Sequence, residues 1–140
     1  MVDYRKIPDG IPAMLVDVRN GVEKLEDKVD FWWQPVGPLG ELDQYAELLQ
    51  TVSKHPTVFA TTLASVENHG ALLFMSPNRE SYGRETAQIA HAILTGTEPG
   101  TIPPTPPAEY ILALNLKTAL LLNIVIPSEQ FKLAGDHVYQ

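Results

Sequence analysis

One stretch decides the fold of this chain: it reads GALLFM over residues 70–75, SPNRESY over 76–82 and GRETAQIAHAILTG over 83–96. The apolar run, bounded by glycine and Ser-Pro, predicts a buried strand over 70–75. The polar residues 76–82 predict a loop. Apolar residues then recur at helical spacing, which predicts a helix over 81–94 that ends before Gly96. In an open α/β sheet, ligands bind at a loop of this kind, at the carboxyl end of a strand.

Segments before this stretch predict alternating strands and helices. Periodicity and turn residues assign, in chain order, a strand over 2–7, a helix over 11–27, a strand over 29–36, a loop over 37–40, a helix over 41–53, a strand over 57–62 and a connection over 63–69. Within 11–27 two interpretations compete. Apolar residues from Met14 to Leu25 share one helical face, whereas Asn20-Gly21 between Val-rich flanks is typical of a hairpin. The charged residues 23–28 favour the helix.

The C-terminal third begins with a strap, because five prolines fall between Thr97 and Pro107 and keep that segment extended. A strand over 109–114, a short helix over 116–122, an extended piece over 124–127 and a tail that docks on the body are expected to follow. Strands that alternate with helices indicate βαβ units. The predicted fold class is therefore α/β, a Rossmann-like three-layer sandwich with a mainly parallel sheet, in a single domain over 1–140.

Composition excludes several kinds of partner. The net charge is −7 with only ten Lys and Arg residues, and these are scattered, which argues against nucleic acid and anionic membranes. The chain has no cysteine, so disulfides, Cys-bound zinc and thiol catalysis are excluded. The N-terminus lacks the apolar core of a signal peptide, and the longest apolar run, 119–122, is too short to span a bilayer.

Five motifs stand out along the chain. They are KVDFW at 28–32, PTVFAT at 56–61, GAL at 70–72 with YGRETA at 82–87, ILTGTEP at 93–99 with Ile102-Pro103, and NLKTA at 115–119 leading to IVIP at 124–127. Together they resemble the C-terminal half of tryptophan/tyrosine-type ABC-transporter substrate-binding proteins, over about residues 22–138.

This resemblance implies one lobe of a type I periplasmic-binding-protein-like fold, with residues 108–140 as a closing segment. It implies a protein that binds a small solute, often an aromatic amino acid, and delivers it to an ABC permease, in the periplasm or at the outer side of a membrane. The first lobe and its signal peptide would lie outside this sequence. The chain is then either a fragment or a shortened relative that forms a homo-oligomer to cover its exposed apolar helix.

Loops 36–40, 61–64 and 76–82 are the expected binding loops. Where the family carries an Asp-Asn anchor, this chain has Val-Gly-Pro-Leu-Gly, so backbone N–H groups around Gly37 are left to meet an anion. Asn78 stands where the family has an acidic residue and can accept a hydrogen bond from an ammonium group. The candidate ligand-binding residues are Gly37, Thr61, Thr62, Asn78 and Tyr82.

Four of these five candidates also have a structural interpretation. Gly37 could simply belong to a loop, and Thr61 and Thr62 could form hydrogen bonds within the protein at the end of their strand. Tyr82 could pack in the core at the start of the helix. Trp32 and Trp33 point to opposite faces of their strand, and core packing is favoured for them over stacking on a solute.

Enzyme activity is not predicted. The four histidines are far apart without metal-ligand spacing, no nucleophile motif accompanies His69 and Glu67, and no glycine-rich loop follows a strand to hold a nucleotide. No cofactor or metal is expected. The alternative to a solute-binding component is a sensory or protein-interaction domain that keeps the fold without tight ligand binding.

Overall fold

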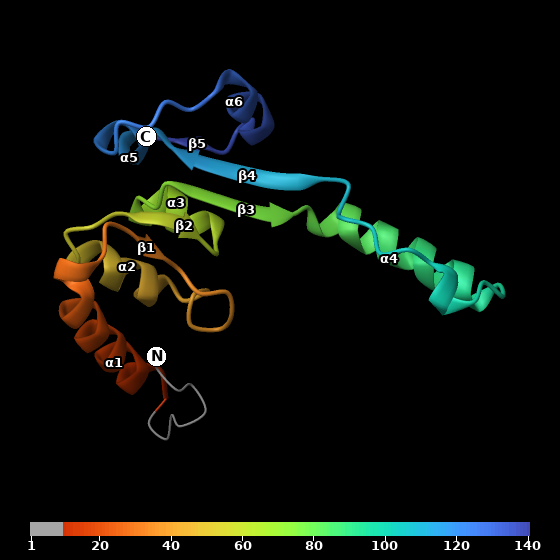
Figure 1. Ribbon diagram of the computed structural model, residues 1–140, viewed down its shortest axis with the longest axis horizontal. Helices are drawn as coiled ribbons and strands as arrows, with labels where there is room; N and C mark the ends of the chain where they lie inside the picture. Colours follow the sequence, from red (N-terminus) through yellow and green to blue (C-terminus); the bar gives the residue numbers. More distant parts are fainter. Residues whose placement is uncertain (1–9) are drawn as a thin grey trace.

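The computed structural model describes residues 10–140, so the strand expected over 2–7 lies outside the described residues. A five-stranded sheet runs through the molecule in chain order (Figure 1). The strands are β1 (Trp32–Trp33), β2 (Thr57–Ala60), β3 (Leu73–Pro77), β4 (Tyr110–Asn115) and β5 (Val138–Tyr139). β1, β2 and β3 are parallel, β4 runs antiparallel to β3, and β5 is parallel to β4. The predicted mainly parallel sheet is confirmed.

Helices lie on both faces of this sheet. They are α1 (Gly10–Leu25), α2 (Asp43–Val52), α3 (Leu63–His69), α4 (Arg79–Leu94), α5 (Leu116–Leu121) and α6 (Ser128–Ala134), with 3-10 turns at Glu26–Lys28 and Pro99–Thr101. In β4, Ala113 packs with Val66 of α3, whereas Leu112 and Leu114 pack with Ala134 of α6. Since successive strand residues point to opposite faces, α3 and α6 cover opposite sides. The three-layer α/β architecture is confirmed.

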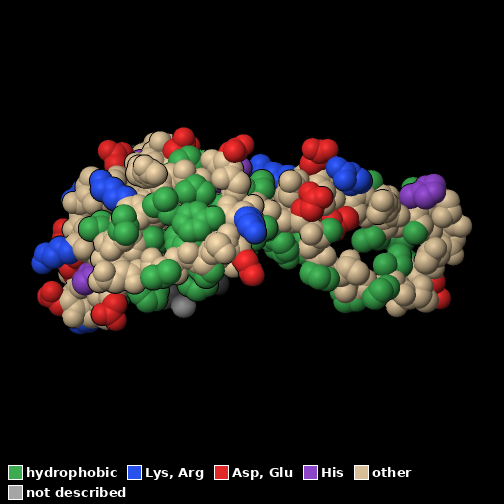
Figure 2. All heavy atoms as spheres, turned by 90° about the horizontal axis from the view of Figure 1, so that it is seen from above, with side chains coloured by type: hydrophobic (Ala, Val, Ile, Leu, Met, Phe, Trp, Pro, Cys, Tyr) green, Lys and Arg blue, Asp and Glu red, His purple; other side chains and the backbone are tan. Residues whose placement is uncertain are grey.

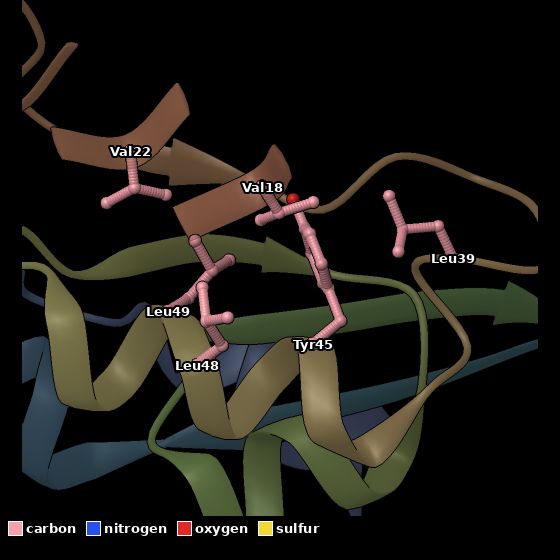
Figure 3. Packing of buried hydrophobic residues seen from close by; sticks show 6 residues of the cluster. All are labelled: Val18, Val22, Leu39, Tyr45, Leu48 and Leu49. Atoms are coloured by element: carbon pink, nitrogen blue, oxygen red, sulfur yellow. The ribbon is translucent and has the colours of Figure 1, made fainter. Parts of the chain in front are cut away.

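A separate apolar cluster joins α1 to α2. Figure 3 shows Tyr45, Leu48 and Leu49 of α2 pointing toward Val18 and Val22 of α1. The two valines are four residues apart and so share one face of a helix. This packing confirms the helical interpretation of 11–27, and the alternative hairpin at Asn20-Gly21 is wrong.

Residues 63–69 form a helix, so the prediction of a plain connection is wrong. Thr62 caps its start, because the Thr62 side chain accepts from the Ser65 N–H. Gly70 caps its end with φ of 68°, a left-handed conformation that glycine adopts readily. Gly70 is thus a helix cap, and the third strand begins later, at Leu73, and continues to Pro77.

The first strand is shorter than predicted. Only Trp32 and Trp33 form this strand, and their pairing with Thr57 and Phe59 of β2 is irregular, because the register shifts between the two tryptophans. The C-terminal tail is more ordered than predicted, because it forms α6 and then returns as β5 beside β4. The expected docking of the tail on the body is confirmed.

α4 leaves the body as an arm, defined here as residues 79–108 (Figure 1). It begins at Arg79, three residues before the predicted end of the loop, and the Pro-rich strap runs back beside it. Among the described residues, α4 has no more than marginal contact with any other helix or strand. Only Ser81 of this helix is buried, and Tyr82 is 56% exposed. The assignment of Tyr82 to the core is wrong.

Candidate functional site

A cleft of about 780 Å³ opens at the carboxyl ends of β2 and β3. Its walls come from the segments that follow these strands, from the loop after β1 and from the far end of the chain. The lining residues include Val36, Glu41, Phe59–Leu63, Phe74–Glu80, Ile111 and His137. Parallel strands bring their carboxyl ends to one edge of a sheet, which is where open α/β folds bind ligands. The loop after the 70–75 stretch therefore does reach a cleft.

Thr61 is held at the floor of the cleft by two hydrogen bonds. Its hydroxyl donates to the Gly40 carbonyl over 2.7 Å, and its N–H donates to Oε1 of Gln34 over 3.1 Å. Gln34 is fully buried. With the Thr61 proton already donated, the hydroxyl oxygen is left to accept from a ligand rather than to donate.

Thr62 and Asn78 are both helix caps. Thr62 shares a 2.8 Å contact with the Ser65 hydroxyl besides capping α3. Oδ1 of Asn78 accepts from the N–H groups of Glu80 and Ser81, at 3.0 and 3.1 Å. Because that oxygen is committed to the cap, the Asn78 amide group remains to donate. This favours a ligand group that accepts a hydrogen bond, the opposite of the expected ammonium group.

Charged side chains stand at the rim of the cleft. Glu41 and Glu80 are acidic, and Arg79 is the only lysine or arginine among the lining residues. Glu80 forms a 3.1 Å ion pair with Arg84, one turn further along α4. Asn78 and Arg79 both line the cleft, and the side chain of each carries hydrogen-bond donors.

Two of the five predicted residues lie outside the lining. Gly37 forms a turn with φ of 128°, and its carbonyl accepts from the Glu41 N–H. Tyr82 lies on α4 beyond the rim. The cleft brings Thr61, Thr62 and Asn78 together. Whether any of the five binds a ligand stays a prediction.

Sequence reasoning did not single out Gln34, Arg79 or His137. Arg79 lies within the predicted binding loop 76–82, so its charge beside Asn78 was the available signal. For Gln34, the available signal was weaker: it is a polar residue within an aromatic strand. His137 reaches the cleft only because the tail returns beside β4, which no local pattern indicates.

Trp32 and Trp33 point to opposite faces, as predicted. Trp32 packs against the α1/α2 cluster, and its Nε1 donates to the Ser53 hydroxyl over 2.6 Å. Trp33 is 65% exposed, with its ring centroid 5.2 Å from that of Phe59. Core packing is confirmed for Trp32 and wrong for Trp33.

The fold is that of a lobe of periplasmic-binding-protein-like molecules. The chain belongs to the family of ABC transporter substrate binding proteins, whose sequence profile matches residues 13–138. The expected resemblance is thereby confirmed. A search among curated proteins found no match.

Solved structures with the same fold are only distantly similar in sequence. An ABC domain in complex with L-Trp from Streptococcus pneumonia is 23% identical, with a TM-score of 0.59 over 90% of this chain and 43% of that one. A conserved domain protein from Vibrio cholerae is 23% identical, with a TM-score of 0.56 over 90% of this chain and 42% of that one.

A third similar structure is the ligand-free, open form of a substrate binding protein with adhesive properties from Clostridium difficile, 19% identical, with a TM-score of 0.52 over 89% of this chain and 40% of that one. This chain thus spans about two fifths of the length of these structures. Within residues 10–140, every helix is too short or too polar to cross a bilayer.

Proposed function

We propose that this chain is part of the solute-binding component of an ABC-type importer, that it binds a small polar solute such as an amino acid, and that it performs no catalysis. The observation that carries the proposal is the cleft at the carboxyl ends of β2 and β3 in a member of the substrate-binding family. The similar structure with L-Trp supports an amino acid as the solute class. The partner would be an ABC permease, and the working place would be outside the cytoplasmic membrane.

Arg79 and Asn78 are the groups proposed to hold the carboxylate of the solute. The Asn78 amide group and the Arg79 guanidinium both donate hydrogen bonds, and charge-assisted bonds of this type are among the strongest in proteins. Phe59 and Met75 would form the apolar wall beside them.

The test is the melting temperature of the chain against a panel of free amino acids. A ligand present at one hundred times its Kd should stabilise the fold by about 2.7 kcal/mol. Arg79→Ala should weaken the apparent affinity for the amino acid at least tenfold, because a charged donor is lost. The shift in melting temperature at a given ligand concentration should fall accordingly. Arg84→Ala is the matched control, since this arginine lies on the same helix outside the cleft lining and pairs with Glu80.

A panel without any effect on melting would contradict solute binding by this chain. It would favour the second candidate, a protein-interaction domain that keeps the fold. One observation supports that candidate: Thr61, Thr62 and the Asn78 oxygen already form hydrogen bonds within the protein, so these groups keep only part of their hydrogen-bonding capacity for a ligand.

A further inference from the structure

Gln34 is a polar side chain in the interior of the body. It directly follows β1 and is only 1% exposed, although glutamine is seldom fully buried. Its backbone N–H donates to the Phe59 carbonyl over 3.0 Å, and its side-chain Oε1 accepts from the Thr61 N–H over 3.1 Å. Both of these bonds join Gln34 to the end of β2.

The two bonds imitate the pattern of a parallel ladder. In a regular parallel pair, the residue that donates to the Phe59 carbonyl accepts from the Thr61 N–H with its own backbone carbonyl. Gln34 accepts with its side-chain carbonyl instead. The side chain thus completes the pairing of β2 after the regular strand β1 has ended at Trp33.

The loop that follows Gln34 returns to the same threonine. The Thr61 hydroxyl donates to the Gly40 carbonyl over 2.7 Å. The approach is close, because a Cβ at Gly40 would lie 2.9 Å from the Thr61 hydroxyl oxygen. Thr61 is therefore held from both ends of the loop, its N–H by Gln34 and its hydroxyl by Gly40. We name these three residues the clamp.

The clamp fixes what Thr61 can offer to a ligand. Its N–H and its O–H are both donated within the protein, and the hydroxyl oxygen keeps the capacity to accept. Among the described residues Thr61, and not Gln34, lines the cleft. Without the Gln34 acceptor, the Thr61 N–H would be left to donate, and the floor of the cleft would suit the opposite kind of ligand group.

The donor groups of the cleft come from a different part of the molecule. Asn78 and Arg79 stand where α4 begins, and Figure 2 shows the arm extending from there away from the body. Their side chains carry donors that suit a carboxylate, whereas the clamp on the body presents an acceptor. A solute with a carboxylate at one end and a donor group at the other complements both sides.

We propose that Gln34 is a positioning residue of the cleft: by holding the Thr61 N–H, it keeps Thr61 as an acceptor and so selects solutes that bring a donor group, an ammonium group above all. A charged donor strengthens the bond to a neutral acceptor, and the Glu41 carboxylate in the same lining favours the same group. The inference rests on the proposed solute binding and deepens it, because it assigns the selection of one end of the solute.

Amide hydrogen exchange followed by NMR tests the positioning without any solute. Gln34→Leu removes the acceptor, so the Thr61 amide should exchange about tenfold faster or more. Gln34→Glu keeps a side-chain oxygen and should restore most of the protection. Gln50→Leu is the matched control, because Gln50 is exposed on α2, and it should leave the exchange of Thr61 unchanged.

Calorimetry tests the selection of the ammonium group. Each amino acid that binds in the melting panel is compared with its analogue without that group, which for L-tryptophan is 3-indolepropanoate. Gln34→Leu and Thr61→Val should each reduce the preference for the amino acid about fivefold or more, with little change in the affinity for the analogue. Gln50→Leu should keep the preference. A purely structural role of Gln34 would weaken the binding of both compounds equally.

Two results would overturn the inference. They are a Thr61 amide that exchanges in Gln34→Leu as slowly as in the wild type, and equal losses of affinity for the amino acid and its analogue. Gln34→Met, unbranched like glutamine but without the amide, replaces Gln34→Leu where that variant does not fold. A panel in which no amino acid binds would remove the selection together with the proposed function, whereas the exchange rates would still decide whether Gln34 holds Thr61.

Discussion

The body and the arm of this protein are held by different forces. In the body, buried apolar clusters link segments distant in sequence, such as α1 with α2 and β4 with α6. In the arm, α4 is fixed by neighbours along the chain: the Asn78 cap, the Glu80–Arg84 ion pair and the 3.0 Å bond from the Ser81 hydroxyl to Glu85. Tertiary packing thus determines the body, whereas the arm is held by local interactions together with a hydrogen bond from the Ala108 N–H of the strap to Glu85 over 3.2 Å.

The largest expected difference between the two regions concerns glycine. A Cβ at Gly40 in the body would lie 1.9 Å from the Pro35 carbonyl oxygen, whereas one at Gly83 in the arm meets nothing within 4 Å. Gly40→Ala should lower the free energy of unfolding by about 3 kcal/mol, because the backbone must shift. Gly83→Ala should stabilise α4 by about 0.5–1 kcal/mol.

Urea denaturation followed by circular dichroism measures both glycine variants. A Gly40→Ala protein as stable as the wild type would show that the loop after β1 moves without cost, and the account of a tightly fixed cleft floor would then be wrong.

A second difference concerns two asparagine caps. Asn115 in the body is buried; its Nδ2 donates to the Val66 carbonyl over 2.9 Å while its Oδ1 accepts from the Thr118 N–H. Asn115→Ala strands both backbone groups and should cost about 2 kcal/mol. Asn78→Ala at the base of the arm loses only a cap near water and should cost about 1 kcal/mol.

Hydrogen exchange separates these two effects. Asn115→Ala should increase exchange across α3, β4 and α5 together, because the side chain joins them. Asn78→Ala should increase exchange in α4 alone. Equal effects of both variants across the whole chain would contradict the division into body and arm.

Much of the fold followed from local patterns in the sequence. The apolar periodicity around Leu49, the proline-rich strap and the aromatic pair Trp32-Trp33 were sufficient to predict α2, the extended segment and the first strand. α3 was missed because its seven residues are too few for periodicity, and its signal lay in the cap Thr62 and the terminator Gly70.

The arm and the site were harder to predict, for a physical reason. The apolar spacing of α4 indicates a face but does not say what covers it, so Tyr82 was assigned to a core. The lining of the cleft by His137 depends on the return of the tail as β5. Such features depend on contacts between segments that are distant in the sequence, and the secondary-structure propensity of a single segment contains no information on them.

A third prediction concerns the polar contacts that join the 3-10 turn after α1 to the segment after α2 and to β1. The Glu26 carboxylate accepts from the Lys54 N–H and from the Ser53 hydroxyl, and the Ser53 hydroxyl also accepts from Trp32. The backbone N–H of Lys54 is the main cause that lowers the pKa of Glu26 below its usual 4.5, with Ser53, His55 and the Lys54 charge adding to it.

When the pKa of a carboxyl group is lower in the folded than in the unfolded state, the group stabilises the fold at pH values above its unfolded-state pKa. This stability is lost as the pH falls through the folded-state pKa. Glu26→Gln should therefore be less stable than the wild type at pH 7, and the gap should shrink below about pH 4. Urea midpoints from pH 3 to 7 measure it, with Glu23→Gln on the exposed side of α1 as control. A gap that is constant with pH would contradict the role of the charge.

The smallest expected effect on stability concerns the residues that follow two helices. In the arm, α4 is followed by Gly96 with φ of 107°, whereas in the body α5 is followed by Asn123 with φ of 54°. An asparagine tolerates the left-handed region at some cost, and glycine removes that cost. Asn123→Gly should therefore stabilise the body by about 0.5 kcal/mol, seen as a higher urea midpoint.

Asn20→Gly is the matched control for this variant, because Asn20 lies exposed within α1, where glycine should destabilise by about 0.5 kcal/mol. Opposite signs of the two substitutions would show that backbone conformation, rather than loss of the asparagine side chain, determines the result. Equal signs would mean that the Asn123 side chain itself stabilises the end of α5, a contribution that Gly96 cannot make at the end of α4.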